Sequence, residues 1–127
     1  MFLLKSFILA VLILAGLVCL YAADITGKWT AEFDSQVGVQ KYTFEFKADG
    51  ANLTGMAISK IGDAEAQTKI TEGKISGDDV SFVENLNYQG MELRIAYKGK
   101  ISGDEIKFAR TVGDAGGETF VAKRVKQ

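Results

Sequence analysis

Lys41-Tyr42-Thr43-Phe44-Glu45-Phe46-Lys47 alternates between two kinds of side chain: aromatic residues fill every second position, and polar or charged residues fill the others. Successive side chains of a β-strand point to opposite faces, so this period of two is typical of a half-buried strand. The same alternation recurs at 91–101 and 105–108, and no helical period follows residue 24. The sequence therefore predicts an all-β domain over residues 24–127.

Eight strands are predicted, and six of the seven breaks between them carry Gly-Asp, Asp-Gly or Gln-Gly turn residues. Connections this short join only neighbouring antiparallel strands, because a parallel crossover needs about a dozen residues or more. The sheet is therefore predicted to be an up-and-down meander. Its expected strands are 27–33, 40–48, 52–59, 67–75, 80–88, 91–101, 105–112 and 118–125.

An internal repeat defines the hairpin unit. The stretch GKISGDDVSF at 73–82 matches GKISGDEIKF at 99–108 in seven of ten positions, and a looser copy spans 46–55. No Pro is present to protect a sheet edge, and closure of the sheet removes its edges altogether. We therefore expect an eight-stranded closed barrel in which 27–33 pairs with 118–125. The tight repeat turns and both termini would share one end, and the other end would be open.

The first 23 residues differ from the rest of the chain. A short start with one positive charge precedes an unbroken apolar run at 7–20, and small residues follow at 22 and 23. This layout predicts a hydrophobic helix that acts as a signal peptide, cleaved near Ala22 or Ala23, and an exported domain in the periplasm or outside the cell. Retention of the helix, residues 3–23, as a single-span anchor is the alternative, because the apolar run approaches the length needed to cross a bilayer.

The composition of the exported part excludes several classes of site. It contains no Cys, no His and no Pro. The usual zinc ligands and the commonest general base are therefore missing. Without Lys5 the chain has 14 basic and 16 acidic residues, a net charge of −2, and the charges are interspersed, which argues against a nucleic-acid surface. No cofactor, metal or catalytic site is predicted, and the chain is not expected to be an enzyme.

The first predicted strand opens with Gly27-Lys28-Trp29. This Gly-x-Trp start resembles that of lipocalins and avidins, which are small β-barrels. In lipocalins an Arg of the last strand packs over this Trp and plugs the closed end of the barrel. The resemblance implies that Arg124 closes the barrel over Trp29, as a structural pair.

A longer stretch, at 53–65, resembles the third strand and following loop of bacterial avidins. Through this resemblance Ser35 and Ser59 correspond to serines that bind the ureido group of biotin. Ala31 and Ala57 replace other ligand-binding residues of that family, and no Trp follows Trp29. The resemblance therefore implies a shared fold rather than biotin binding. The whole exported part also resembles small, uncharacterised exported bacterial domains that occur beside carbohydrate-active enzymes.

Two charged residues are predicted to point into the barrel. Glu84 and Arg110 occupy equivalent positions of the repeat, two residues after Phe82 and Phe108 respectively, and so share the inner face with them. A buried charge is costly unless it is paired. An internal Glu84–Arg110 ion pair is one interpretation, and a polar floor for a ligand is the other.

The open end is the predicted ligand site, because ligands of small barrels lie at the mouth. The candidate ligand-binding residues are Ser35, Ser59, Asp63, Glu84, Tyr88 and Arg110. The first hypothesis is a non-catalytic binding module for a small molecule, such as a carbohydrate. The alternative is a membrane-anchored accessory subunit of a larger membrane protein complex. The mass of the mature protein distinguishes them, because the alternative requires the leader to be retained.

Overall fold

The computed structural model describes residues 24–126, and the predicted leader and its hydrophobic helix lie outside this part of the chain. The described residues form eight strands and no helix that is long and apolar enough to cross a membrane. The strands are β1 (Gly27–Ser35), β2 (Gly38–Asp49), β3 (Asn52–Ile61), β4 (Ala64–Ser76), β5 (Asp79–Tyr88), β6 (Met91–Ser102), β7 (Glu105–Val112) and β8 (Gly117–Arg124).

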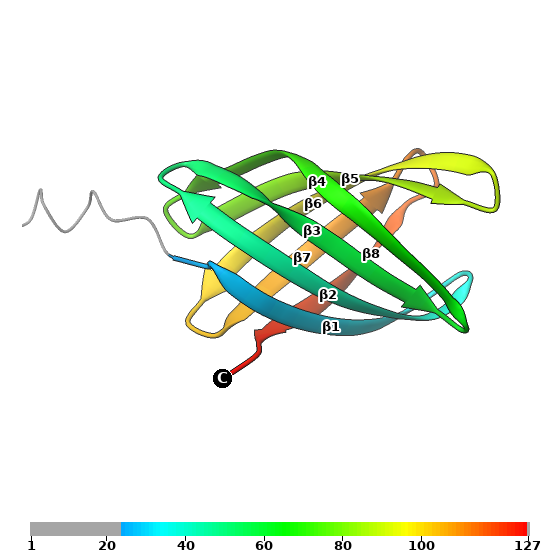
Figure 1. Cartoon of the computed structure of the whole chain (residues 1–127), viewed down its shortest axis with the longest axis horizontal. Coiled ribbons are helices and arrows are strands. Elements are labelled where there is room, and N and C mark those ends of the chain that lie inside the picture. Colours follow the sequence, from blue (N-terminus) through cyan, green and yellow to red (C-terminus); the bar gives the residue numbers. More distant parts are fainter. Residues whose placement is uncertain (1–23, 127) are drawn as a thin grey trace, which may run out of the picture.

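The strands close into one antiparallel barrel in the order of the sequence (Figure 1). The closing pair is β1 with β8, where Trp29 lies opposite Arg124 and Thr30 lies opposite Lys123. The Val125 N–H also donates to the Lys28 carbonyl oxygen at 2.9 Å. The prediction of a closed, up-and-down barrel of eight strands is therefore confirmed.

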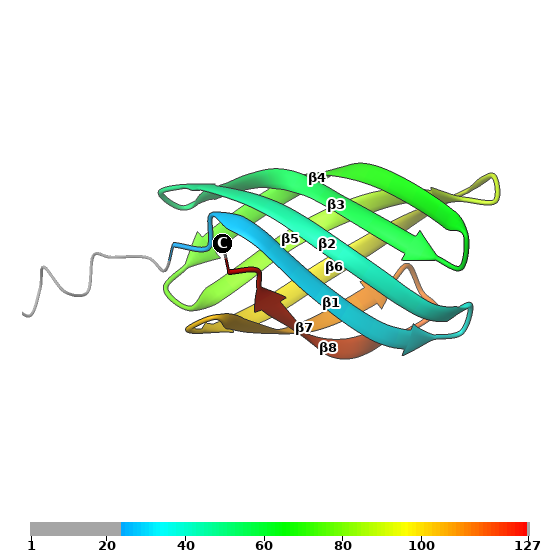
Figure 2. The same cartoon turned by 60° about the horizontal axis from the view of Figure 1, so that its bottom comes forward.

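The two ends of the barrel differ, as Figure 2 shows. The start of β1 and the end of β8 lie at the same end as the three repeat turns, whose glycines 50, 77 and 103 have φ near +60°. The other end carries the remaining hairpins. Two of its links were predicted as 34–39 and 60–65, and both predictions are too long. The paired strands continue until only two residues remain in each link, Gln36-Val37 in the first and Gly62-Asp63 in the second.

The interior between the ends is packed with aromatic rings. Phe44 is fully buried at the centre, and its ring lies 5.2–6.5 Å from six others. Those rings are Tyr42, Phe46, Phe82, Tyr97, Phe108 and Phe120. The repeat explains part of this core, since Phe82 and Phe108 are the same position of two successive hairpins. Core packing of this density leaves no room for a ligand in the middle of the barrel.

Arg124 seals the closed end. Its guanidinium lies 4.5 Å from the centre of the Trp29 ring, and its nitrogens donate to the carbonyl oxygens of Asp24 and Thr26 and to Asp104 Oδ1. The Trp29 indole is fully buried and donates to the Ile25 carbonyl oxygen at 2.8 Å. The predicted pairing of Trp29 with Arg124 is present, and it joins both ends of the domain to the turn between β6 and β7.

A bulge in β4 bends the sheet, because the stretch from Lys69 to Gly73 is one residue longer than the facing stretch from Leu53 to Met56. The register between β3 and β4 shifts between Leu53 and Met56, and Gly55 within it has a φ of 151°. A Cβ at this position would lie 1.9 Å from the Glu45 carbonyl oxygen of β2, so only glycine fits. Bulges increase strand twist and bending, which helps a small sheet to close.

Candidate functional site

A cavity of about 420 Å³ opens at the end of the barrel opposite the termini. Its size falls within the range of about 300–1,000 Å³ that is usual for small-molecule sites. The walls are mainly apolar, from Leu86, Leu93, Ile95 and Val112, and the polar side chains of Gln40 and Arg110 also line it. The mouth is therefore hollow, whereas the aromatic core fills the barrel below it.

Arg110 of β7 is the buried cation of this cavity, with only 3% of its surface exposed. Its guanidinium lies over three aromatic rings, 4.8 Å from the centre of Phe33, 5.3 Å from Tyr42 and 5.5 Å from Tyr97. Its Nη1 donates to Gln40 Oε1 at 3.2 Å. The rings and the amide together hold the cation at the boundary between the core and the cavity.

A chain of hydrogen bonds connects Arg110 to the first mouth hairpin. Gln40 is buried, and its Nε2 donates to Ser35 Oγ at 2.7 Å. The Ser35 hydroxyl in turn donates to the Gly38 carbonyl oxygen at 2.8 Å. Because an amide has a defined donor end and acceptor end, this chain presents the Gln40 oxygen to Arg110.

Glu84 does not form the predicted ion pair with Arg110. Among residues 24–126, no carboxylate oxygen lies within 4.0 Å of an Arg110 nitrogen. Glu84 Oε1 instead accepts hydrogen bonds from the hydroxyls of Tyr42 at 3.0 Å and Tyr97 at 2.8 Å. The ion-pair interpretation is wrong because the two tyrosines supply the hydrogen-bond partners of Glu84, and Gln40 supplies that of Arg110.

Burial raises the pKa of the Glu84 carboxyl above its usual range, because the side chain is fully enclosed. The hydrogen bonds from Tyr97 and Tyr42 and the charge of Arg110 oppose this shift only in part. Glu84 Oε2 has no hydrogen-bond partner among the described residues, which adds to the cost of ionisation. The pKa values of both tyrosine hydroxyls are raised as well, first by burial and then by Glu84.

Substitution Glu84→Gln is expected to weaken the dependence of stability on pH. In the wild type the folded state holds the Glu84 proton more tightly than the unfolded state does. The stability that Glu84 contributes in this way is fully present below the pKa of its carboxyl in the unfolded chain, and it is lost as pH rises through the pKa in the folded protein. Its size is about 1.4 kcal/mol for each pH unit by which the two pKa values differ. An amide has no proton to lose, so the free energy of unfolding from urea titrations should fall less between pH 5 and pH 8 in the variant.

The matched control for this measurement is Glu92→Gln, which changes an exposed carboxyl on β6. It should retain the pH dependence of the wild type. Equal pH dependence in the Glu84 variant and the wild type would show that burial does not shift the Glu84 proton equilibrium.

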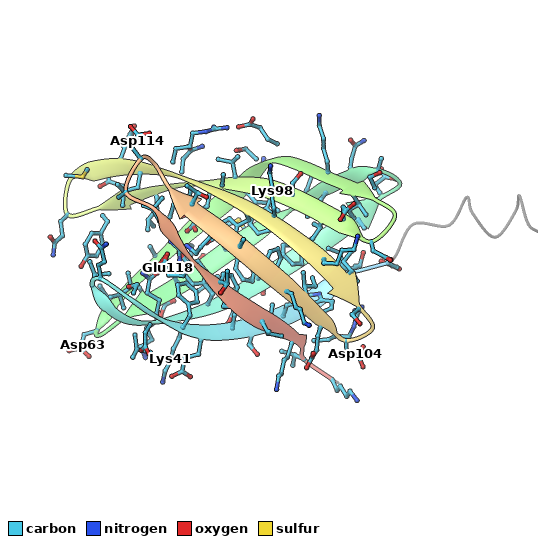
Figure 3. All side chains as sticks on the ribbon, turned by 180° about the vertical axis from the view of Figure 1, so that it is seen from behind. Lys41, Asp63, Lys98, Asp104, Asp114 and Glu118 are labelled. Carbon is cyan, nitrogen blue, oxygen red and sulfur yellow. The ribbon has the colours of Figure 1, made fainter. Side chains whose placement is uncertain are left out.

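The remaining predicted site residues divide into two groups. Ser35 and Tyr88 line the cavity together with Arg110. Ser59 is buried on the inner face of β3, Asp63 is exposed in its hairpin, and neither belongs to the cavity lining. Figure 3 shows Asp63 at the mouth end, on the outside of the barrel. Glu84 also lies outside the lining and is fully buried.

Three residues of the site were missing from the sequence prediction: Gln40, Tyr42 and Tyr97. Alternation placed Tyr42 and Tyr97 on the inner face, where their hydroxyls need hydrogen-bond partners. Glu84 was the acid predicted on the same face, so its bonds to both tyrosines could have been predicted from the sequence. Gln40 lies two residues before Tyr42 and so shares the same face. Its contact with Arg110, 70 residues away, depends on barrel closure.

Neither metal ligands nor known relatives indicate what the cavity holds. Within residues 24–126, no group of three or more Asp, Glu, His or Cys side chains is placed to hold a metal ion. Comparison of the chain with protein-family models, with curated proteins and with solved structures finds no match. The functional argument therefore depends on the geometry of the cavity.

Proposed function

We propose that the chain is an exported, non-catalytic binding module that holds one small molecule at the mouth of its barrel. The observation that carries this proposal is the contrast between the two ends. The closed end is sealed by Trp29 and Arg124, whereas a cavity of about 420 Å³ with a buried cation, Arg110, occupies the mouth. Barrels of eight strands have room for one small ligand above a packed core.

The polar groups of the cavity support a binding role over a purely structural one. Apolar side chains in place of a buried charge are often as stable or more stable, so stability alone does not require a cation here. Arg110 is nevertheless held in place by the Ser35–Gln40 chain and by three aromatic rings. The arrangement orients one cation beside an apolar cavity at a cost in stability.

The walls favour a ligand with an apolar body over a carbohydrate. Sugars commonly stack on exposed aromatic faces, and Tyr88 is the only aromatic side chain of the lining. The other walls are aliphatic, and each buried methylene contributes about 0.8 kcal/mol to the binding of an apolar group. A carbohydrate ligand would leave many hydroxyls opposite side chains that cannot form hydrogen bonds with them.

Export is part of the proposal because of the composition of the first 23 residues. Their single basic residue, apolar run and small residues at 22 and 23 are those of a secretory leader. The barrel would then act in the periplasm or outside the cell.

The accessory-subunit hypothesis has one observation in its favour. Three exposed apolar side chains lie near the mouth, with exposed fractions of 48% for Val37, 45% for Val39 and 64% for Met91. Such side chains could meet a partner protein. This alternative also requires residues 3–23 to remain in the mature protein, so a mature mass without the leader would exclude it.

The cavity is tested by methyl NMR of the 24–127 domain during titration with decan-1-ol, decanoate and glucose. Binding at the mouth should shift the methyl signals of Leu86, Leu93 and Val112, which line the cavity, and leave those of Ile75 and Val80 unchanged. Val112→Phe should weaken decan-1-ol binding by about tenfold or more, because a phenyl ring at the mouth displaces at least two methylenes of the ligand.

Val121→Phe is the matched control, since Val121 is exposed on the outside of β8. It should bind decan-1-ol as the wild type does. If none of the three compounds shifts the mouth methyls, the proposed binding function is wrong.

A further inference from the structure

We propose that the ligand is a monocarboxylate with an apolar body, bound with its carboxylate on Arg110 and its body between the aliphatic walls of the mouth. This inference rests on the proposed binding function and names the chemical class of its ligand. Three features carry it: the donors of Arg110, the balance of charge around it, and the size and polarity of the cavity.

The donors of Arg110 are only partly used by the protein. A guanidinium has five N–H donors in a planar fork, which matches the two oxygens of a carboxylate. Nη1 donates to Gln40 Oε1, and Nε has no hydrogen-bond partner among the described residues. The buried guanidinium therefore keeps donor capacity beside the cavity that it lines.

The charge of Arg110 is also incompletely balanced. Glu84 is held by the hydroxyls of Tyr42 and Tyr97 rather than by Arg110, and burial raises the pKa of its carboxyl. Glu118 of β8 lies opposite Arg110 in the ladder and lines the mouth, but among residues 24–126 it forms no ion pair within 4.0 Å. Figure 3 shows Glu118 on β8, the strand that follows the link carrying Asp114.

A buried cation without a close anion is costly, and a bound anion would offset that cost. One negative charge fits this site better than two. A phosphate dianion would bring a second charge into a mainly apolar cavity in which Ser35 and Gln40 already bond to each other. Glu118 at the mouth would repel the additional charge. The carboxylate is the monoanion whose shape matches the fork.

The body of the ligand follows from the cavity. At about 30 Å³ for each water-sized group, the volume of about 420 Å³ holds about 14 non-hydrogen atoms. Leu86, Leu93, Ile95 and Val112 form its walls, and the exposed Val37 and Met91 continue the apolar surface onto the rim. An unbranched carboxylate of about ten to twelve carbons fits this space.

The test compares decanoate with decan-1-ol, which have the same chain length and differ in head group. Isothermal titration calorimetry on the wild-type 24–127 domain at pH 8 should show decanoate binding about tenfold to hundredfold more tightly, the range for a charged hydrogen bond. Arg110→Met should remove this difference while decan-1-ol still binds. Arg94→Met, which removes an exposed arginine of β6, should preserve it.

The outcomes separate this inference from the proposed function. If decan-1-ol binds as tightly as decanoate, or if glucose alone binds, the function stands and the carboxylate inference is overturned. If no compound binds, both fail. The wild-type comparison needs no variant, so it decides the inference even if Arg110→Met does not fold. A decanoate preference that persists in Arg110→Met would also overturn the assignment of Arg110.

Discussion

Phe44→Ala is expected to lower the free energy of unfolding by about 3–5 kcal/mol, the usual cost of removing a fully buried phenyl ring. Phe44 is completely buried at the centre of the barrel and contacts aromatic rings from β2, β5, β6, β7 and β8. Removal of its ring leaves a cavity that the surrounding closed sheet cannot easily collapse to fill. Urea unfolding followed by far-ultraviolet circular dichroism measures the change.

The control is Val121→Ala on the outer face of β8, which should change stability by less than about 0.5 kcal/mol because the site is exposed. A loss below about 1 kcal/mol in Phe44→Ala would contradict the packing described for the barrel centre. The total stability of a domain this size is about 5–15 kcal/mol, so this loss is a large fraction of it.

Arg124→Gln is expected to destabilise the domain by about 2–4 kcal/mol. The substitution removes the cation over the Trp29 ring and leaves the carbonyl oxygens of Asp24 and Thr26 without their donor. Only about a quarter of the Arg124 side chain is exposed, so solvent replaces these contacts poorly. Thermal and urea unfolding should both show the loss.

Arg94→Gln provides a sharp contrast. Arg94 also forms a close ion pair, with Glu72 at 2.8 Å, but both side chains are more than half exposed. Exposed pairs contribute little to stability, so this variant should unfold almost like the wild type. Equal effects of the two substitutions would mean that Arg124 acts only through its surface pair with Asp104 and not as the seal of the closed end.

The two regions of the barrel thus have separate roles. The closed end and the aromatic centre determine whether the domain folds, whereas the mouth keeps an unfilled volume and an incompletely satisfied cation. Substitutions at Phe44 or Arg124 should therefore alter stability first, and those at Val112 or Arg110 should alter binding first. Measurement of both properties in each variant tests this division directly.

Local rules were sufficient to predict the strands. The alternation at 41–47 fixed which side chains of β2 face inward, and the Gly-Asp turns fixed the hairpins. The lengths of the mouth hairpins were wrong because ladder hydrogen bonds extend strands as far as the partner strand allows. Val39 shows this effect, because it is exposed and yet pairs with Asp34 of β1.

The candidate site could be predicted only in part. Alternation placed Glu84 and Arg110 inside, and the hairpin repeat placed them at equivalent positions of β5 and β7. Whether the two charges meet depends on the side chains between them. Tyr97 of β6 lies opposite Arg110 of β7 and diagonally from Glu84 of β5. Its hydroxyl therefore bonds to the Glu84 carboxyl, while its ring faces the Arg110 guanidinium.

The sequence by itself determined the all-β class, the order and direction of the strands, and the inward face of the strands whose alternation is regular, because these follow from period-two alternation and turn residues within short stretches. Only the tertiary structure decided that Gln40 meets Arg110, that two tyrosines bond to Glu84, and that the mouth is hollow. Such features depend on distances across the barrel between residues as many as 70 positions apart. Those distances are set by how the closed sheet curves and how its side chains fill the interior, and no local pattern records either.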